Sequence, residues 1–305
     1  MTAAARTPAG NMGAGLTLSL LSACCYGVLP VLGKLGYAAG LDIRTMLLCR
    51  YAFAAAFVGG YILLTGPRRF RIDGPTLLGA ALLGGVIYPL QSLCFFGAVA
   101  RIPASTTTLV FYGYPVTVAL LSWAVFHQPI RRSMAASLGL VILGIALVFS
   151  NAFLQRADPL GLLLALGSLV VFTLYLILVQ RFLAGRDPFT LTFWVLLSAA
   201  VAMAVATPWS GMAHLSPRAL TIGALLGLVP TALAVTLLYQ AVIRIGSAYV
   251  SVFSTLEPVV AVLASWAMLG EPLDPLKLAG AALIIAGIVW PNWKLIRNSG
   301  PIARA

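Results

Sequence analysis

One acidic residue of this sequence lies in the middle of a long apolar stretch. It is Glu257; the other acidic residues stand near the ends of such stretches or between them, namely Asp42, Asp73, Asp158, Asp187, Glu271 and Asp274. At the centre of a membrane an unpaired carboxylate costs at least about 2.5 kcal/mol. Glu257 is therefore predicted to be protonated, paired or in contact with water. It could act in proton coupling or gating, or it could have a structural role beside Pro258 or a basic residue.

Two basic residues, Arg50 and Lys34, also lie inside apolar stretches. Arg50 lies about eight residues, or ~12 Å, into its stretch at a helical rise of ~1.5 Å per residue. Lys34 is near enough to an end for its ammonium group to reach water. Arg50 could balance the charge of a carboxylate substrate such as an amino acid. Alternatively, it could join helices through backbone carbonyls or through Glu257.

Five prolines interrupt the apolar stretches and are candidates for gating: Pro30, Pro89, Pro115, Pro230 and Pro258. A proline inside a helix removes one backbone hydrogen bond and frees a carbonyl. Within lipid, that carbonyl must be satisfied by protein or by a water-filled cavity. The prolines thus predict a central cavity, and the alternative is that they only shape helix packing.

Aromatic and polar side chains are dense on the same stretches. The predicted cavity-lining set is Tyr26, Arg50, Tyr88, Gln91, Tyr112, Tyr114, Trp194, Tyr239, Gln240, Tyr249 and Thr255. A cavity lined by rings and a few hydrogen-bonding groups suits a small amphipathic solute with an apolar side chain. Part of the set could instead belong to an aromatic belt or to helix contacts.

The residue sets typical of enzymes and metal sites are missing from the sequence. The two histidines, His127 and His214, stand in different halves without a nucleophile or a carboxylate cluster beside them. The four cysteines lack metal-ligand spacing and are interpreted as small buried apolar residues; they are Cys24, Cys25, Cys49 and Cys94. We expect no enzyme and no metal site, and no phosphate loop or dinucleotide motif predicts a cofactor.

The elements that must position these residues are membrane spans. Hydrophobic residues make up 61% of the chain and charged residues 9%, whereas a soluble domain is about one-quarter charged. At about 20 residues per span, the apolar stretches predict ten helices, at residues 14–38, 42–65, 74–99, 103–126, 131–150, 158–182, 188–208, 216–242, 247–269 and 275–293. The net charge of +12 is dispersed between the stretches, which predicts contact with anionic lipid and no binding of nucleic acid.

The two halves of the chain resemble each other. Arg101-Ile102 of the first half recurs as Arg244-Ile245 in the second, which defines a repeat offset of 244 − 101 = 143. At the same offset Pro115 matches Pro258, and Ser122-Trp123 matches Ser265-Trp266. A duplication explains these coincidences, and it predicts two five-helix units, at residues 14–150 and 158–293.

An odd number of spans in each unit requires the second unit to enter the membrane with the opposite orientation. The loop after the fourth span carries the basic pair Arg131-Arg132, whereas the equivalent loop of the second half carries Glu271 and Asp274. This change agrees with the positive-inside rule if both termini are cytoplasmic. Inverted repeats of this kind are typical of secondary transporters.

The chain also resembles a known family. The motifs that carry the resemblance are Arg50-Tyr51-Ala52-Phe53-Ala54-Ala55, Tyr114-Pro115-Val116, Leu256-Glu257-Pro258-Val259 and Leu269-Gly270-Glu271-Pro272-Leu273. Their order and duplication resemble the drug/metabolite transporter superfamily, in particular its members with paired EamA-type repeats, over about residues 14–293. Two departures are His127-Gln128 in place of the usual Gly-Glu, and Tyr26 where the family often has Trp. The resemblance implies an all-α membrane fold of ten helices in two inverted five-helix repeats, and export of amino acids or related metabolites.

Taken together, these patterns predict a secondary transporter that works by alternating access in a bacterial inner membrane. Its predicted substrates are amino acids, aromatic and other apolar ones in particular. The alternative is transport or exchange of another metabolite, such as a sugar derivative or a nucleotide-linked sugar, which would require several converging basic groups. The expected partners are a small-molecule substrate and the lipid bilayer. A monomer is compatible with the sequence, which leaves the direction of transport and its coupling open.

Overall fold

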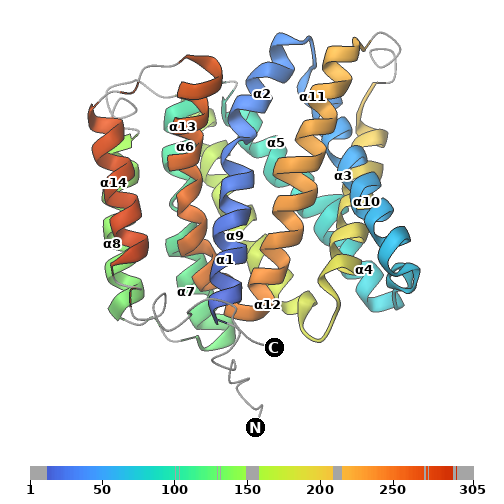
Figure 1. Cartoon of the computed structure of the whole chain (residues 1–305), viewed down its shortest axis with the longest axis horizontal. Coiled ribbons are helices and arrows are strands. Elements are labelled where there is room, and N and C mark those ends of the chain that lie inside the picture. The colour runs from blue at the N-terminus through green and yellow to red at the C-terminus, as the bar shows by residue number, and fades with distance from the viewer. Residues whose placement is uncertain are drawn as a thin grey trace.

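The structure, a computed structural model, describes residues 12–99, 101–102, 104–128, 130, 132–148, 158–208, 215–270, 273, 275–290 and 293. These residues form helices and connecting turns, with no β-strand among them. The helices stand side by side in one bundle (Figure 1). The predicted all-α fold is confirmed.

The first repeat contains three discontinuous spans and two continuous ones. The discontinuous spans are α1 (Met12–Gly27) with α2 (Leu29–Ala38), α4 (Gly74–Leu82) with the π-helical turn η3 (Leu83–Ile87) and α5 (Tyr88–Val99), and α6 (Ala104–Phe111) with α7 (Tyr114–Phe126). The continuous spans are α3 (Ile43–Thr65), which the short 3₁₀ helix η2 (Pro67–Phe70) follows, and α8 (Arg132–Val148). A π-helical turn leaves the regular hydrogen-bonding pattern and often marks a functional region.

The second repeat has the same order of spans, but its first span is one continuous helix, α9 (Pro159–Leu183). The elements that follow are α10 (Pro188–Ala206), α11 (Pro217–Gly227), the π-helical turn η6 (Leu228–Leu233), α12 (Ala234–Phe253), the 3₁₀ turn η7 (Ser254–Leu256), α13 (Glu257–Leu269) and α14 (Pro275–Val289). α12 contains a sharp turn at Gly246, whose φ of 80° lies in the left-handed region that favours glycine. The turn separates the eighth span from the ninth.

Helix lengths agree with ten spans in the described part of the chain. Seven stretches are long and apolar enough to cross a membrane, and one of them, Pro217–Leu269, has 53 residues. Because this stretch turns at Gly246, it supplies two spans. The shorter apolar helices Arg132–Val148 and Pro275–Val289 complete the set. The chain is therefore a multi-pass membrane protein built from two five-helix units.

Capping residues fix where several spans begin. Side chains of Asp42, Asp73, Asp158, Asp187 and Ser216 accept hydrogen bonds from backbone N–H groups in the first turns of α3, α4, α9, α10 and α11. Such bonds satisfy donors that a helix start leaves free. At Asp73 the hydroxyl of Thr76, followed by its backbone N–H, lowers the pKa of the carboxyl group, so the cap is ionised at neutral pH.

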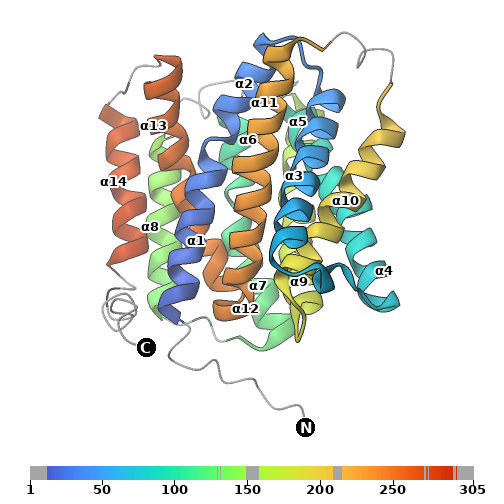
Figure 2. The same cartoon turned by 45° about the vertical axis from the view of Figure 1, so that its right-hand side comes forward.

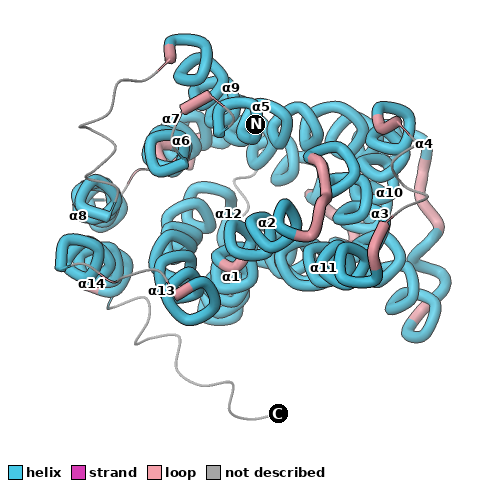
Figure 3. Tube along the Cα trace, turned by 90° about the horizontal axis from the view of Figure 1, so that it is seen from above, coloured by secondary structure: helices cyan, strands magenta, loops and turns pink. Residues whose placement is uncertain are grey.

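Equivalent helices of the two repeats pack against each other across an approximate two-fold axis. α3 packs against α10 and α8 against α14, and these two pairs lie at opposite ends of the bundle (Figure 3). The first helix of each repeat packs on the other repeat, because α1 contacts α12 and α9 contacts α5. The two repeats are thus interlocked.

Close glycine contacts obey the same two-fold relation. The backbone at Gly84 touches the backbone at Val195, and the backbone at Gly227 touches that at Arg50. Gly84 and Gly227 are equivalent, because they are separated by the repeat offset (227 − 84 = 143). In both places a methyl group would collide with the facing backbone. Small residues are needed at these positions, because the spans approach closely there.

α1 begins and α14 ends at one face of the bundle, which we call the terminal face (Figure 2). The end of α2 and the start of α11 lie at the opposite face. Residues at the break between α1 and α2 consequently lie inside the bundle, at a depth where lipid surrounds it.

Candidate functional site

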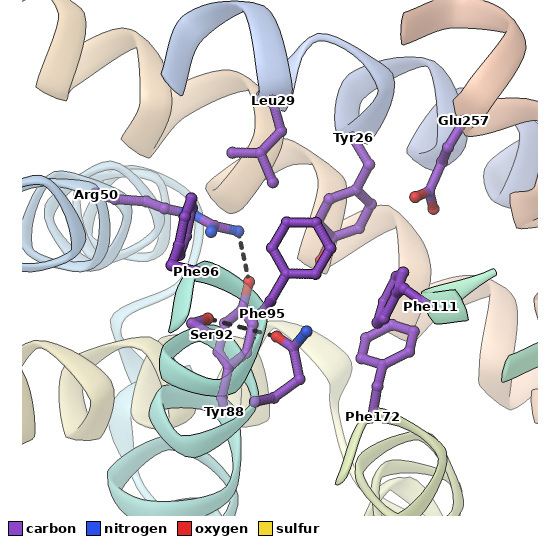
Figure 4. A pocket seen from close by; sticks show the side chains of 11 residues that line it. Tyr26, Leu29, Arg50, Tyr88, Ser92, Phe95, Phe96, Phe111, Phe172 and Glu257 are labelled. Carbon is purple, nitrogen blue, oxygen red and sulfur yellow. Dashed lines mark hydrogen bonds between the residues drawn. The ribbon is translucent and has the colours of Figure 1, made fainter. Parts of the chain in front are cut away.

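A cavity of about 90 Å³ lies inside the bundle, beside the break between α1 and α2 (Figure 4). Its lining residues are Tyr26, Leu29, Arg50, Tyr88, Gln91, Ser92, Phe95, Phe96, Phe111, Phe172 and Glu257. They come from α1, α2, α3, α5, α6, α9 and α13, so both repeats contribute. Most of the lining is aromatic, and one guanidinium and one carboxylate belong to it.

Arg50 is a buried residue of α3 held by two hydroxyl groups. Its Nε donates to Oγ1 of Thr231 at 2.7 Å, and its Nη2 donates to the phenolic oxygen of Tyr88 at 2.8 Å. Tyr88 and Thr231 are separated by the repeat offset (231 − 88 = 143), so they occupy equivalent positions in the two repeats. Arg50 therefore joins the two repeats near the two-fold axis.

The π-helical turn η6 orients Thr231, one of the two hydrogen-bond partners of Arg50. Thr231 lies within η6, and its hydroxyl donates to the carbonyl of Leu226 five residues earlier. That hydroxyl accepts from Arg50 at the same time. The irregular turn thus supplies a hydroxyl oriented toward the guanidinium.

Neighbouring tyrosine rings support the other partner, Tyr88. The rings of Tyr51 and Tyr88 lie 5.1 Å apart, and the guanidinium carbon of Arg50 lies 5.5 Å and 5.7 Å from their centroids. Tyr88 stacks on Tyr175 at 5.2 Å, and the hydroxyls of Tyr175 and Tyr239 are 2.6 Å apart. Arginine stacks favourably on aromatic rings, so these contacts hold Arg50 in place.

Glu257 is the first residue of α13, directly after the 3₁₀ turn η7. The positive end of the helix dipole favours a negative charge at this position. The hydroxyl of Tyr112 donates to its carboxylate over a long distance of 3.4 Å, and the half-buried side chain lines the cavity. In the first repeat the equivalent residue is the buried Tyr114 (257 − 114 = 143).

Phenylalanines form the apolar wall of the cavity. The ring of Phe111 lies 5.4 Å from that of Phe95 and 5.3 Å from that of Phe172. Phe95 and Phe96 pack edge to face at 5.7 Å. Figure 4 shows Phe111 and Phe172 near Glu257, with Phe95 between them and Arg50.

The structure brings five of the predicted residues to the cavity, namely Tyr26, Arg50, Tyr88, Gln91 and Glu257. The predicted lining residues Tyr112 and Tyr114 lie directly behind it, because both rings pack near Phe111. Tyr239 is fully buried one layer deeper, against Tyr175.

Four predicted residues lie elsewhere. The indole nitrogen of Trp194 in α10 donates to the carbonyl of Phe70, the last residue of η2. The backbone carbonyl of Gln240 accepts from Arg244, and the hydroxyl of Thr255 donates to the carbonyl of Val252. Tyr249 packs with an apolar cluster. Their helices carry polar residues on more than one face, and the sequence does not tell which face meets the cavity.

The predicted prolines mark the breaks in the spans. Pro115 and Pro258 are buried in the first turns of α7 and α13, and Pro30 stands in the first turn of α2. Pro89 follows the π-helical turn η3, and Pro230 lies inside η6. The breaks at the starts of α2 and α13 place Tyr26 and Glu257 at the cavity.

Sequence reasoning missed the phenylalanine wall, although a signal for part of it exists. Phe95 follows Gln91 by four residues, and Phe96 follows Ser92 by four, so each pair shares one face of α5. The interpretation of the cysteines was wrong in part, since only Cys49 is buried and Cys24 is exposed on the outside of the bundle.

Polar contacts close the bundle between the cavity and the terminal face. The backbone N–H of Ser247 donates to Oε1 of Gln180 at 2.6 Å, and its hydroxyl is 2.9 Å from that of Ser122. The side chain of Gln128 packs on the turn at Gly246. The ends of α7 and α9 and the turn within α12 are thereby held together.

A second hollow, of about 380 Å³, lies between α7 and α9. Its lining includes the exposed Leu120, Val170 and Leu174 and the threonines Thr117 and Thr173, whose hydroxyls are 2.6 Å apart. Among the described residues, no charged side chain lines it. Its uncharged walls are suited to lipid and offer no group for an ion. Within the described part of the chain, no cluster of His, Cys, Asp or Glu could hold a metal ion.

Comparison with known proteins agrees with this architecture. The model of the EamA-like transporter family matches residues 13–150 and again residues 159–293. The uncharacterized transporter YwfM of Bacillus subtilis is 27% identical over 220 residues, which are 70% of this chain and 72% of that protein. The threonine/homoserine exporter RhtA of Escherichia coli K12 is 24% identical over 213 residues, 70% of this chain and 68% of that protein. A crystal structure with 16% identity superposes with a TM-score of 0.77 over 94% of this chain and 99% of that one, a likeness of fold alone.

Proposed function

Since the chain belongs to the EamA-like transporter family of the drug/metabolite transporter superfamily, we propose that it is a secondary transporter that exports amino acids. Its substrates are aromatic and other apolar amino acids, and it works by alternating access in a bacterial inner membrane. Both termini lie in the cytoplasm. The predicted five-helix units, 14–150 and 158–293, move relative to each other around the cavity.

The observation that carries the proposal is a cavity with aromatic walls and a guanidinium inside the membrane. A carboxylate that enters such a site finds a positive charge, and an apolar side chain finds rings. Amino acids of the proposed kind have both features. The similarity to an exporter of threonine and homoserine supports the same substrate class.

The alternative of a nucleotide-linked or phosphorylated sugar has less support from this cavity. A phosphate group usually engages several basic side chains. Arg50 is the one basic residue that lines the described cavity.

Alternating access has support from where the bundle is closed. Ser122, Gln180 and Ser247 hold the helices together on the terminal side of the cavity. Export would require these contacts to open when the opposite side closes. The helix breaks beside Pro30, Pro115 and Pro258 are places where spans could bend.

The test is flux into proteoliposomes with a panel of labelled amino acids, measured with and without a pH gradient. We expect saturable uptake of at least one apolar amino acid, absent from protein-free liposomes. Uptake that fails to saturate would indicate a channel, and no uptake of any amino acid would refute the substrate class.

The same assay with the Glu257→Gln variant tests the role of Glu257 in coupling. If Glu257 couples transport to protons, wild-type flux follows the pH gradient and the folded variant no longer responds to it. Flux that is indifferent to the gradient in both proteins would remove the coupling role and leave facilitated transport.

A further inference from the structure

One basic and one acidic side chain line the same small cavity without forming an ion pair with each other. Arg50 and Glu257 both contribute to its wall. Within the described part of the chain, no carboxylate lies within ion-pair distance of Arg50, whose partners are hydroxyl groups. Figure 4 shows the guanidinium and the carboxylate on different sides of the cavity, with Tyr26 between them.

On one side of the cavity, the guanidinium of Arg50 retains its positive charge and has N–H groups left to donate. The hydroxyls of Thr231 and Tyr88 orient the guanidinium through Nε and Nη2 but bring no negative charge. A guanidinium has five N–H groups, so others remain for a ligand. An oriented guanidinium with free N–H groups is suited to a carboxylate.

The Glu257 side retains acceptor capacity. One long hydrogen bond from Tyr112 reaches Oε2, whereas an ionised carboxylate has about four acceptor positions. A primary ammonium group has three donors and a matching charge. The carboxylate therefore suits an ammonium group that enters the cavity.

Resting on the transport function proposed above, we propose that the cavity recognises its substrate as a zwitterion. Arg50 donates to the substrate carboxylate, Glu257 accepts from its ammonium group, and the apolar side chain packs against Phe95, Phe111 and Phe172. Glu257 is then a substrate-binding residue that determines specificity.

The net charge of the site explains why a zwitterion is preferred. Arg50 and an ionised Glu257 together are neutral, and a zwitterion adds no net charge when it enters. An amine alone would leave Arg50 without a counter-charge, and an acid alone would leave Glu257 without one. In a low-dielectric site, leaving one charge unpaired is strongly unfavourable, so ligands with a single charge are selected against.

The experiment uses the purified full-length protein and two families of probes. One family is L-phenylalanine, 2-phenylethylamine and 3-phenylpropionate; the other is L-leucine, 3-methylbutylamine and 4-methylpentanoate. Each family keeps one side chain and removes either the carboxylate or the amino group. Apparent affinities are obtained from the concentration dependence of thermal stabilisation.

We expect the amino acid of at least one family to bind about 10- to 100-fold more tightly than either of its fragments, the range for a hydrogen bond to a charged group. In Glu257→Gln the affinity for the amino acid falls to that for the acid, while the affinity for the acid does not fall. In Arg50→Gln the affinity for the amino acid falls to the affinity for the amine.

A control variant keeps these results interpretable. Arg44→Gln removes a positive charge from α3 at an exposed position outside the cavity. It should retain the preference for the amino acid. If Arg50→Gln does not fold, Glu257→Gln alone decides, because an amide has nearly the size of a carboxylate.

Fragments that bind as tightly as the amino acid would overturn the zwitterion proposal, as would an equal loss of acid and amino acid in Glu257→Gln. Flux in proteoliposomes without this selectivity would leave the transport proposal standing. Selective binding without flux would refute the transport proposal and leave the zwitterion proposal standing. If no amino acid binds, the zwitterion proposal is overturned.

Discussion

Arg50 carries its charge inside a membrane-spanning helix, and the hydroxyls of Thr231 and Tyr88 are its hydrogen-bond partners in the described structure. A charged side chain at that depth is costly unless it is bonded or faces a polar cavity. Both conditions are met at Arg50. Because the two hydroxyls come from equivalent positions of the two repeats, the side chain links the repeats and lines the cavity at once.

At this scale we predict that Thr231→Val is destabilising. The change leaves Nε of Arg50 without its acceptor, and losing a hydrogen bond to a charged group costs about 1.5–3 kcal/mol. Thermal or denaturant unfolding of the purified protein measures the loss.

Thr192→Val is the matched control for this prediction. The hydroxyl of Thr192 is buried in α10 and finds no hydrogen-bond partner in the described structure. Its removal should leave stability unchanged or increase it, because a buried unsatisfied polar group is lost. Equal losses of stability in Thr231→Val and Thr192→Val would contradict the assigned role of Thr231.

At the scale of elements, breaks and close contacts position the site. The π-helical turns η3 and η6 lie in equivalent spans and precede or contain the partners of Arg50. Gly84 in η3 and Gly227 before η6 let these spans touch the backbone of α10 and α3. The irregular turns and the close approach together bring Tyr88 and Thr231 to one guanidinium.

We predict that Gly84→Ala destabilises the protein by about 1–3 kcal/mol or more, the cost of forcing a methyl group into a packed contact. The added Cβ would collide with the carbonyl of Val195. Gly85→Ala is the control, since a Cβ there would lie 4.0 Å from its nearest neighbour, the carbonyl oxygen of Ser198. Unfolding curves of both variants provide the measurement. Similar losses of stability in the two variants would argue against the close contact between Gly84 and Val195.

At the scale of the whole molecule, the cavity and the closed region lie at different depths in the bundle. The cavity is lined by Leu29 in the first turn of α2 and by Phe96 near the end of α5, and α2 runs from there to the face opposite the terminal face (Figures 1 and 2). Ser247 is fully buried among the contacts on the terminal side. The two repeats are related by inversion, and this asymmetry is the kind that alternating access requires.

We predict different labelling of two engineered cysteines in a protein whose four native cysteines are replaced. Phe96→Cys should react with a membrane-impermeant maleimide added outside intact cells, because it lines the cavity. Ser247→Cys should be protected. Labelling is read by a mass shift on a gel. Phe96→Cys that reacts solely after the cells are broken would reverse the proposed orientation.

The sequence by itself determined the class, the number of spans and the duplication. Apolar stretches long enough to span lipid, and short connections between them, permit few other structures, since backbone polar groups in lipid must be satisfied within helices. The proline positions also predicted where spans are interrupted. The family resemblance, carried by motifs around Arg50, Pro115 and Glu257, agrees with the family match of both halves.

Only the tertiary structure decided which polar residues meet. Tyr88 and Thr231 belong to different repeats and are distant in sequence, yet they bind one guanidinium. Trp194 resembles the other aromatic candidates in sequence, yet its indole nitrogen bonds to the carbonyl of Phe70 in η2. In a protein surrounded by lipid, both the inside and the outside of the bundle are apolar, so hydrophobic periodicity does not identify the inner face of a helix. Packing between spans identifies it, and that packing depends on contacts distant in sequence.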